Sequence, residues 1–136
     1  MAFTHGKDSS FKIDNSGGSL TDISAYVNNV DFPETVDVAE TTTLGDSAKS
    51  YIVGLSDATI SISGLWDATL DGVLGGIMGQ SATVSFEYSP EGTASGKIKY
   101  TGEAIATSYN QASPVGDVVT FSADLQVSGA VTRGTH

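Results

Sequence analysis

Few residues of this 136-residue sequence have the type and spacing that a catalytic or metal-binding site requires. The two histidines, His5 and His136, lie near opposite ends of the chain, so neither has a second ligand nearby with which to share a metal ion. Ser9 and Lys12 match the serine-to-lysine spacing of one acyl-transfer motif, but its companion motifs are missing. We therefore expect two exposed terminal histidines and interpret the serine and lysine spacing as a chance match.

The carboxylate pairs and the glycines have structural explanations. Asp67 and Asp71 suit the cap and the first turn of a helix, while Glu34 and Asp37 lie beside a proline bend. A group of glycines lacks the spacing of a dinucleotide or phosphate loop and instead indicates close helix packing: Gly72, Gly75, Gly76 and Gly79. We predict no catalytic, cofactor-binding or metal-binding residue, and hence no enzyme.

Composition narrows the function classes further. The sequence is long enough for one domain, and it contains no cysteine, which excludes disulfides, thiolate metal sites and cysteine nucleophiles. With 16 acidic and 6 basic residues the formal net charge is −10, so tight binding to nucleic acid is not expected. The sequence has no apolar run long enough for a signal sequence or a membrane span.

The N-terminal part of the sequence predicts short strands. Phe11 and Ile13 alternate with polar residues, and a turn-forming Asn-Ser-Gly-Gly follows. Residues 20–29 fit either a helical turn or the start of a strand. Over 30–38 the apolar residues occupy even positions and the polar residues odd ones, which predicts a strand with one apolar face; Pro33 indicates an edge strand or a bulge.

One helix and three further strands are expected after residue 66. The helix spans 67–78 and the strands span 82–88, 97–109 and 117–128, with proline- and glycine-containing turns between the strands. The apolar residues of the helix follow a 3.6-residue period: Leu70, Val73, Leu74, Ile77 and Met78. The pattern predicts a mainly β fold, a sandwich or barrel of antiparallel strands with one flanking α-helix.

Residues 41–56 show neither the helical nor the strand period. We predict a long loop there, and a connection of this length is uncommon in a compact domain unless it is functional or disordered. The segment is too apolar for a solvated linker, because it contains Leu44, Tyr51, Ile52, Val53 and Leu55. We therefore expect the loop to pack against another surface, such as that of a neighbouring chain.

Aromatic residues and the last strand complete the expected core. Five aromatic residues lie in or beside predicted strands, where a core position is the default and a ligand-binding groove the alternative: Trp66, Phe86, Tyr88, Tyr100 and Phe121. The last strand alternates most regularly, with a core face of Val119, Phe121, Ala123, Leu125 and Val127. Its other face is polar and carries little charge.

Six stretches of this sequence, taken in order, resemble the major tail tube proteins of phages with long, non-contractile tails, in versions found in phages of actinobacteria. They are VDFP (30–33), ETTTLGD (40–46), AKSYIVGLSD (48–57), ISISG running into WD (60–67), FEYSPEG (86–92) and KYTGE (99–103). No single stretch is a diagnostic motif, but their order and spacing extend over residues 30–103.

The resemblance implies a small β-sandwich that assembles into six-membered rings, whose inner wall is a β-barrel and which stack into a hollow tube through which DNA passes without specific binding. The loop 41–56 would then contact neighbouring subunits through Leu44, Asp46, Lys49, Tyr51, Ile52, Val53 and Leu55. Polar strand faces would line the channel, namely Thr120, Ser122, Asp124 and Gln126 together with Thr59, Ser61 and Ser63.

The resemblance also implies partners and a location. The subunit would contact copies of itself and other tail proteins such as the tape measure, tail terminator and distal tail proteins, and it would reside in the virion tail after assembly in the cytoplasm of the host bacterium. No cofactor and no membrane span are expected. The alternatives are a decoration or carbohydrate- or protein-binding module, or the inner tube subunit of a contractile injection or gene-transfer particle.

Overall fold

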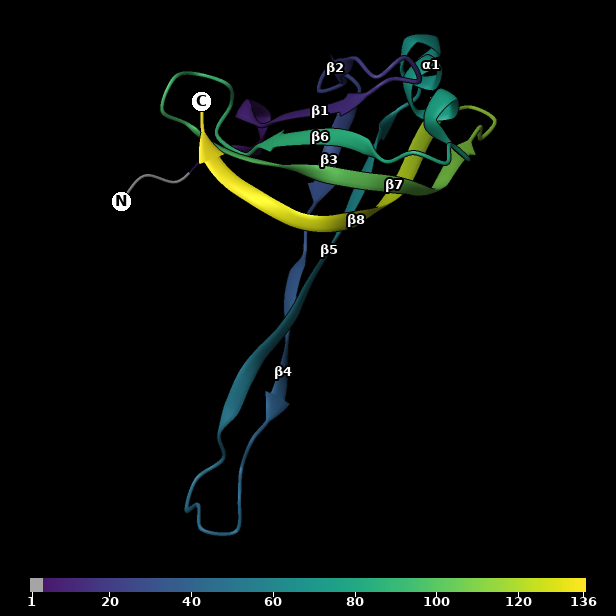
Figure 1. The fold of residues 1–136 in the computed structure, drawn as a ribbon. Coiled ribbons are helices and arrows are strands. Elements are labelled where there is room, and N and C mark those ends of the chain that lie inside the picture. Colours follow the sequence, from purple (N-terminus) through teal and green to yellow (C-terminus); the bar gives the residue numbers. More distant parts are fainter. Residues whose placement is uncertain (1–3) are drawn as a thin grey trace.

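The computed structural model describes residues 4–136, and its strands form an antiparallel sheet with the order β2-β1-β6-β7-β8-β5-β3, while β4 pairs with β5 alone (Figure 1). The strands are β1 (Ser10–Asp14), β2 (Leu20–Asp22), β3 (Val27–Asp31), β4 (Glu34–Glu40), β5 (Tyr51–Leu65), β6 (Val84–Ser89), β7 (Ile98–Ala112) and β8 (Thr120–Thr135), with a 3₁₀ turn η1 (Gly6–Asp8) and one helix α1 (Ala68–Ile77). The predicted fold class, mainly β with one helix, is confirmed, although the sheet does not close into a barrel within one subunit.

Strict alternation along the strands builds the core. The inward residues of β1, β5 and β8 are buried, and four of the five core positions expected on the last strand are among them: Phe121, Ala123, Leu125 and Val127. Ile60 and Ile62 of β5 pair directly with Leu125 and Ala123 of β8, so the same face of both strands is apolar. Burial of each large aliphatic side chain contributes about 1.5–3 kcal/mol, so this face contributes substantially to the driving force for folding.

Helix α1 covers one end of the core. The Asp67 side chain caps it by accepting a hydrogen bond from the Thr69 amide at 2.9 Å, and the chain leaves the helix at Gly79, whose φ of 79° favours glycine. Four of the five residues expected on its packing face are buried: Leu70, Val73, Leu74 and Ile77. The Tyr109 hydroxyl donates to the Asp71 carboxylate at 2.9 Å and so ties the helix to β7.

Several boundaries differ from the sequence expectations. The ambiguous segment 20–29 contains β2, a turn and the start of β3, and Pro33 separates β3 from β4. Strand β8 continues seven residues beyond the expected end at 128, because a bulge at Gly129, with φ 89°, interrupts its alternation.

The prediction of a loop over the whole of 41–56 is wrong for its second part. Residues 51–56 are the first part of β5, which pairs with β4 in a hairpin that extends away from the body (Figure 1). The pairing shifts between Val36 and Val38, so that Gly54 and Leu55 lie opposite the single residue Asp37. This bulge interrupts the two-residue alternation of side chains, so the sequence pattern did not indicate a strand here.

The expectation of an exposed terminal histidine is also wrong for His136. Its Nε2 lies 2.8 Å from the Ser89 Oγ and its Nδ1 lies 3.6 Å from the Glu87 carboxylate, which Lys12 and Lys99 also approach. Two backbone hydrogen bonds, to Gly96 and Lys97 in the turn before β7, place the residue there. Three basic groups thus surround a buried carboxylate, which could not be left there unpaired without a large desolvation cost.

Substitution of Gly64 tests how closely β5 packs against the turn before β3. A Cβ at this position would lie 2.0 Å from the Tyr26 carbonyl oxygen, whereas a Cβ at Gly72 of α1 would meet open space. We predict that Gly64→Ala lowers the free energy of unfolding by about 2 kcal/mol or more, while Gly72→Ala raises it by up to about 1 kcal/mol. Urea unfolding followed by circular dichroism measures both, and a Gly64→Ala protein as stable as the parent would contradict the packing.

Tyr109 provides a pH test of the contact between helix and sheet. Burial, together with the hydrogen bond to the negatively charged Asp71, raises its pKa from the ordinary 10.0 to about 12. The stabilisation is therefore complete below pH 10 and lost as the pH rises through about 12. We predict that thermal stability falls over this range and falls less in Tyr109→Phe; equal losses in both proteins would assign the effect to other groups.

Candidate functional site

The seven residues predicted to line a channel lie together on one face of the sheet. The register pairs Thr59 with Gln126, Ser61 with Asp124 and Ser63 with Ser122, while Thr120 pairs with Leu65 at the end of the same face. Directly paired residues of antiparallel strands share a face. The polar faces expected on the two strands thus form one surface, and its role as a channel lining stays a prediction.

Hydrogen bonds within this polar face hold its side chains in place. The Asp124 carboxylate accepts from Ser61 Oγ of β5 and from Ser108 Oγ of β7, both at 2.9 Å, and thereby bridges three strands. Gln126 Nε2 donates to Asp57 Oδ1 at 2.8 Å. The face is thus an ordered polar surface rather than a set of independent side chains.

Sequence reasoning missed the contributions of β3 and β7 to the polar face. Asn110 pairs with Ser122, and Ser108 reaches Asp124 across a register shift between Ala106 and Ser108. This bulge disturbs the alternation that would have revealed them. Asp31, which pairs with Ser61, was noticed only as the polar side of an apolar strand.

The polar face has one sign of charge and two unpaired edges. Its four strand segments are 27–31, 57–65, 104–112 and 120–128; they contain three acidic residues, Asp31, Asp57 and Asp124, and no lysine or arginine. Among residues 4–136, β3 pairs only with β5, and residues 105–112 of β7 pair only with β8. Both outer edges of this four-stranded unit therefore present backbone groups without a strand partner.

The hairpin of residues 34–56, here called the arm, exposes apolar side chains. The predicted contact residues on it include Leu44 at 108% exposed, Val53 at 78% and Leu55 at 82%, with Tyr51 and Ile52 more than half exposed. Asp46 instead stabilises the tip, because it accepts from the Thr43 amide at 2.7 Å, and Lys49 is exposed. An apolar surface of this kind marks an interaction site in a soluble domain.

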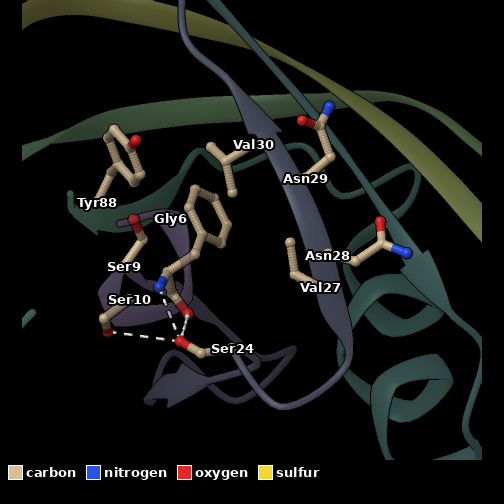
Figure 2. Close-up of a pocket in the computed structure, with 10 residues that line it drawn as sticks. Gly6, Ser9, Ser10, Ser24, Val27, Asn28, Asn29, Val30 and Tyr88 are labelled. Carbon is tan, nitrogen blue, oxygen red and sulfur yellow. Dashed lines mark hydrogen bonds between the residues drawn. The ribbon is translucent and has the colours of Figure 1, made fainter. Parts of the chain in front are cut away.

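A pocket of about 210 Å³ lies at the seam where β1 and β3, near the two ends of the strand order, face one another. Figure 2 shows Val27 and Val30 of β3 on one side of it and Ser9 and Tyr88 on the other. Beside the pocket, the Phe32 ring packs against those of Tyr88 and Tyr100, each at 5.9 Å between ring centres. Burial raises the pKa of the Tyr88 hydroxyl.

The histidine, serine and lysine considered as candidates for catalysis or metal binding do not form a common site. His5 Nδ1 accepts from the Lys7 amide in an exposed turn, Ser9 Oγ donates to the Pro90 carbonyl, and Lys12 approaches Glu87. Within residues 4–136 no group of three histidine or acidic side chains is arranged to hold a metal ion. In the same part of the chain, α1 is the one helix, and it is too short to cross a membrane.

The sequence also matches a known protein family. A family model described as phage tail tube protein matches residues 3–133. The chain belongs to this family. The tail tube role that the sequence resemblance implied is therefore confirmed, and the protein is a structural component of a virion tail. A comparison with curated protein sequences gives no match.

Solved structures share the tail tube fold over most of their length. A chain of the native gene transfer agent virion has a TM-score of 0.82 at 18% identity and covers 98% of this chain and 100% of its own length. The SPP1 tail tube protein gives 0.77 at 14% identity, covering 98% and 80%. The sheath-tube complex of an extracellular contractile injection system gives 0.69 at 14%, covering 98% and 93%.

Proposed function

We propose that this tail tube protein forms six-membered rings that stack into the tail tube, with the polar face turned to the channel. The proposal rests mainly on the four-stranded unit β3-β5-β8-β7, which is apolar on one face, polar on the other and unpaired at both edges. If β3 of one subunit pairs with residues 105–112 of β7 in the next, the ring becomes a continuous barrel without edges. Six copies are supported by the C6 symmetry described for the tail of an empty gene transfer agent particle, 19% identical to this chain.

The charge of the polar face supports passage of DNA without binding. Repeated around a ring, Asp31, Asp57 and Asp124 form acidic belts with no basic residue on the same strand segments. Phosphates are repelled at every position, so no site along the channel would hold the DNA. A channel and an assembly surface need no catalytic residue, and we infer that the protein is not an enzyme.

We assign the arm to contacts with adjacent subunits or rings, where its apolar side chains would be buried. Tube stacking is open-ended, so other tail proteins must occupy the ends, and the structures of similar fold include a sheath/tube terminator and a tube-terminating cap. A tape measure protein and a distal tail protein complete the expected set of partners. Assembly would occur in the host cytoplasm before the tail joins the virion.

Shortening the arm tests this assignment. Replacement of residues 37–55 by an Asn-Gly turn joins Val36 to Ser56, which are paired in the hairpin. We predict a folded protein that no longer forms rings or tubes, because the removed residues have no role in the core. Circular dichroism, sedimentation velocity and negative-stain electron microscopy measure folding and assembly separately.

A matched variant joins Glu40 to Tyr51 and removes only the tip, keeping every paired residue of the hairpin. Its assembly relative to the longer deletion shows whether the strands or the tip make the contact. An unfolded longer deletion would show that the arm belongs to the core of its own subunit. A parent protein that stays monomeric at every concentration, salt and pH would reject the ring proposal itself.

Asp124→Lys tests the channel face. One substitution would place a belt of lysines in every ring, so we predict tails of normal number that release DNA more slowly, with a larger defect at low salt. Loss of the hydrogen bonds from Ser61 and Ser108 should cost about 1 kcal/mol of stability. DNA release is measured at two ionic strengths for particles with equal numbers of intact tails.

Two controls separate charge from folding in this experiment. Asp124→Asn keeps an acceptor for the serines while removing the charge, and Asp117→Lys makes the same charge reversal in the exposed loop between β7 and β8. Equal release rates for Asp124→Lys and Asp117→Lys would place Asp124 outside the channel. Failure of Asp124→Lys alone to form tails would place it in a subunit interface.

A further inference from the structure

The arm has one face that is apolar in the middle and acidic at both ends. Alternation along β4 puts Glu34, Val36, Val38 and Glu40 on one side, and the pairing adds Tyr51 and Val53 to that side. Because Glu34 pairs with the buried Ala58, this side continues the core face of β5 beyond the body. All four β4 residues of this face are exposed.

The basic residues are gathered elsewhere. Within the arm, four acidic residues accompany one lysine, Lys49, while the other five basic residues lie where β1 and β7 begin and β8 ends: Lys7, Lys12, Lys97, Lys99 and Arg133. Lys12 and Lys99 approach Glu87. Lys7, Lys97 and Arg133 are exposed, and no carboxylate in residues 4–136 lies within 4.0 Å of them.

This end of the body stays basic after its own acidic residues are counted. The acidic residues there are Asp8, Asp22, Glu87 and Glu91, one fewer than the five basic ones. Glu87 is already paired with Lys12 and Lys99. The positive charge that remains available to a partner is that of Lys7, Lys97 and Arg133.

The seam pocket lies at the same end, and its lining mixes serines and asparagines with four apolar or aromatic side chains, Phe11, Val27, Val30 and Tyr88. Cross-strand pairs connect Phe11 to Tyr88, Tyr88 to Tyr100 and Tyr100 to Arg133, so these four residues share one face. Lys7 lies between the pocket-lining residues Gly6 and Ser9. A partly open aromatic surface is thus bordered by a cation at either side, with about 210 Å³ of free space beside it.

We propose that the seam pocket and its basic border receive the arm of a second copy of this chain. Val36 and Val38 would enter the pocket and cover the aromatic rings, while Glu34 and Glu40 would face Lys7 and Arg133. The inference deepens the proposed assembly of tubes and rests on it. The arm cannot reach this surface in its own subunit, because it leaves the body in another direction (Figure 1).

Charge argues against a second group of exposed apolar residues as the receiver. Leu65, Val115 and Val118 are exposed at the far end of β5, but Asp67 and Asp117 accompany them without a basic residue in 113–119. An acidic arm would be repelled there and attracted to the seam. Arm and receiver are different surfaces, so the contact is heterologous and propagates around a ring or along a tube.

Cross-linking locates the receiver directly, because the chain has no cysteine of its own. Val38→Cys labels the arm and Gly6→Cys labels the pocket, where a Cβ meets nothing within 4 Å. A mixture of the two assembled with a short bismaleimide should give a covalent dimer. Val38→Cys mixed with Val115→Cys tests the competing surface, and a dimer in that mixture alone would overturn the proposal while leaving tube assembly intact.

Charge reversal tests the electrostatic part. We expect Glu40→Lys and Arg133→Glu each to raise the protein concentration needed for assembly about tenfold or more at low salt, and the double variant to recover most of the loss. Asp37→Lys is the matched control, since Asp37 lies on the opposite face of β4 and should change assembly little. Circular dichroism confirms that each variant is folded.

The outcomes distinguish this inference from the proposed function. If the parent forms tubes but Glu40→Lys behaves like Asp37→Lys, or if the double variant shows the two losses added together, the seam is not the receiver although the tube assignment stands. If the parent forms neither rings nor tubes, the proposed function fails and the inference falls with it. Cross-linking of Val38→Cys to Gly6→Cys together with recovery in the double variant supports both.

Discussion

The alternation of side chains along β5 and β8 is the constraint on which the rest of the structure depends. Their antiparallel register places Ile60 and Ile62 against Leu125 and Ala123 on one face and Ser61 against Asp124 on the other. A slip of one residue would exchange the two faces of a strand and lose both the core and the polar surface. Helix α1, the seam and the outer strands all pack on the inner side of this pair.

The parts that the sequence predicts are those in which one physical preference acts undisturbed. Alternation over 120–127 gave both faces of β8, and a cap at Asp67 followed by a 3.6-residue apolar period gave α1. Alternation also indicated a polar face on each of β5 and β8, and the two faces form one surface because these strands pair without a bulge over 59–65. In such segments the local order of apolar and polar residues is enough to predict which side chains are buried.

The parts that could not be predicted involve an inserted residue or a partner distant in the sequence. Bulges at Gly54, Ala106–Ser108 and Gly129 shift the alternation, so the regular pattern is lost in the hairpin, at Ser108 of β7 and at the end of β8. The environment of His136 depends on Glu87 and Ser89, which lie on β6. The relative position of such segments is set by tertiary packing.

The unequal distribution of charge bears on how subunits with a net charge of −10 can associate at all. Uniform acidity would oppose every contact between copies, and the repulsion would grow with each ring added. Gathering five of the six basic residues at one end leaves the arm and the polar face acidic and gives each copy one attractive surface. In the proposed contact the attraction would be directional, since an acidic arm would meet a basic seam in only one relative orientation of two copies. The same separation lets the polar face remain free of cations, so the surface that would face DNA and the surface that would hold the subunits together are kept apart within a single sheet.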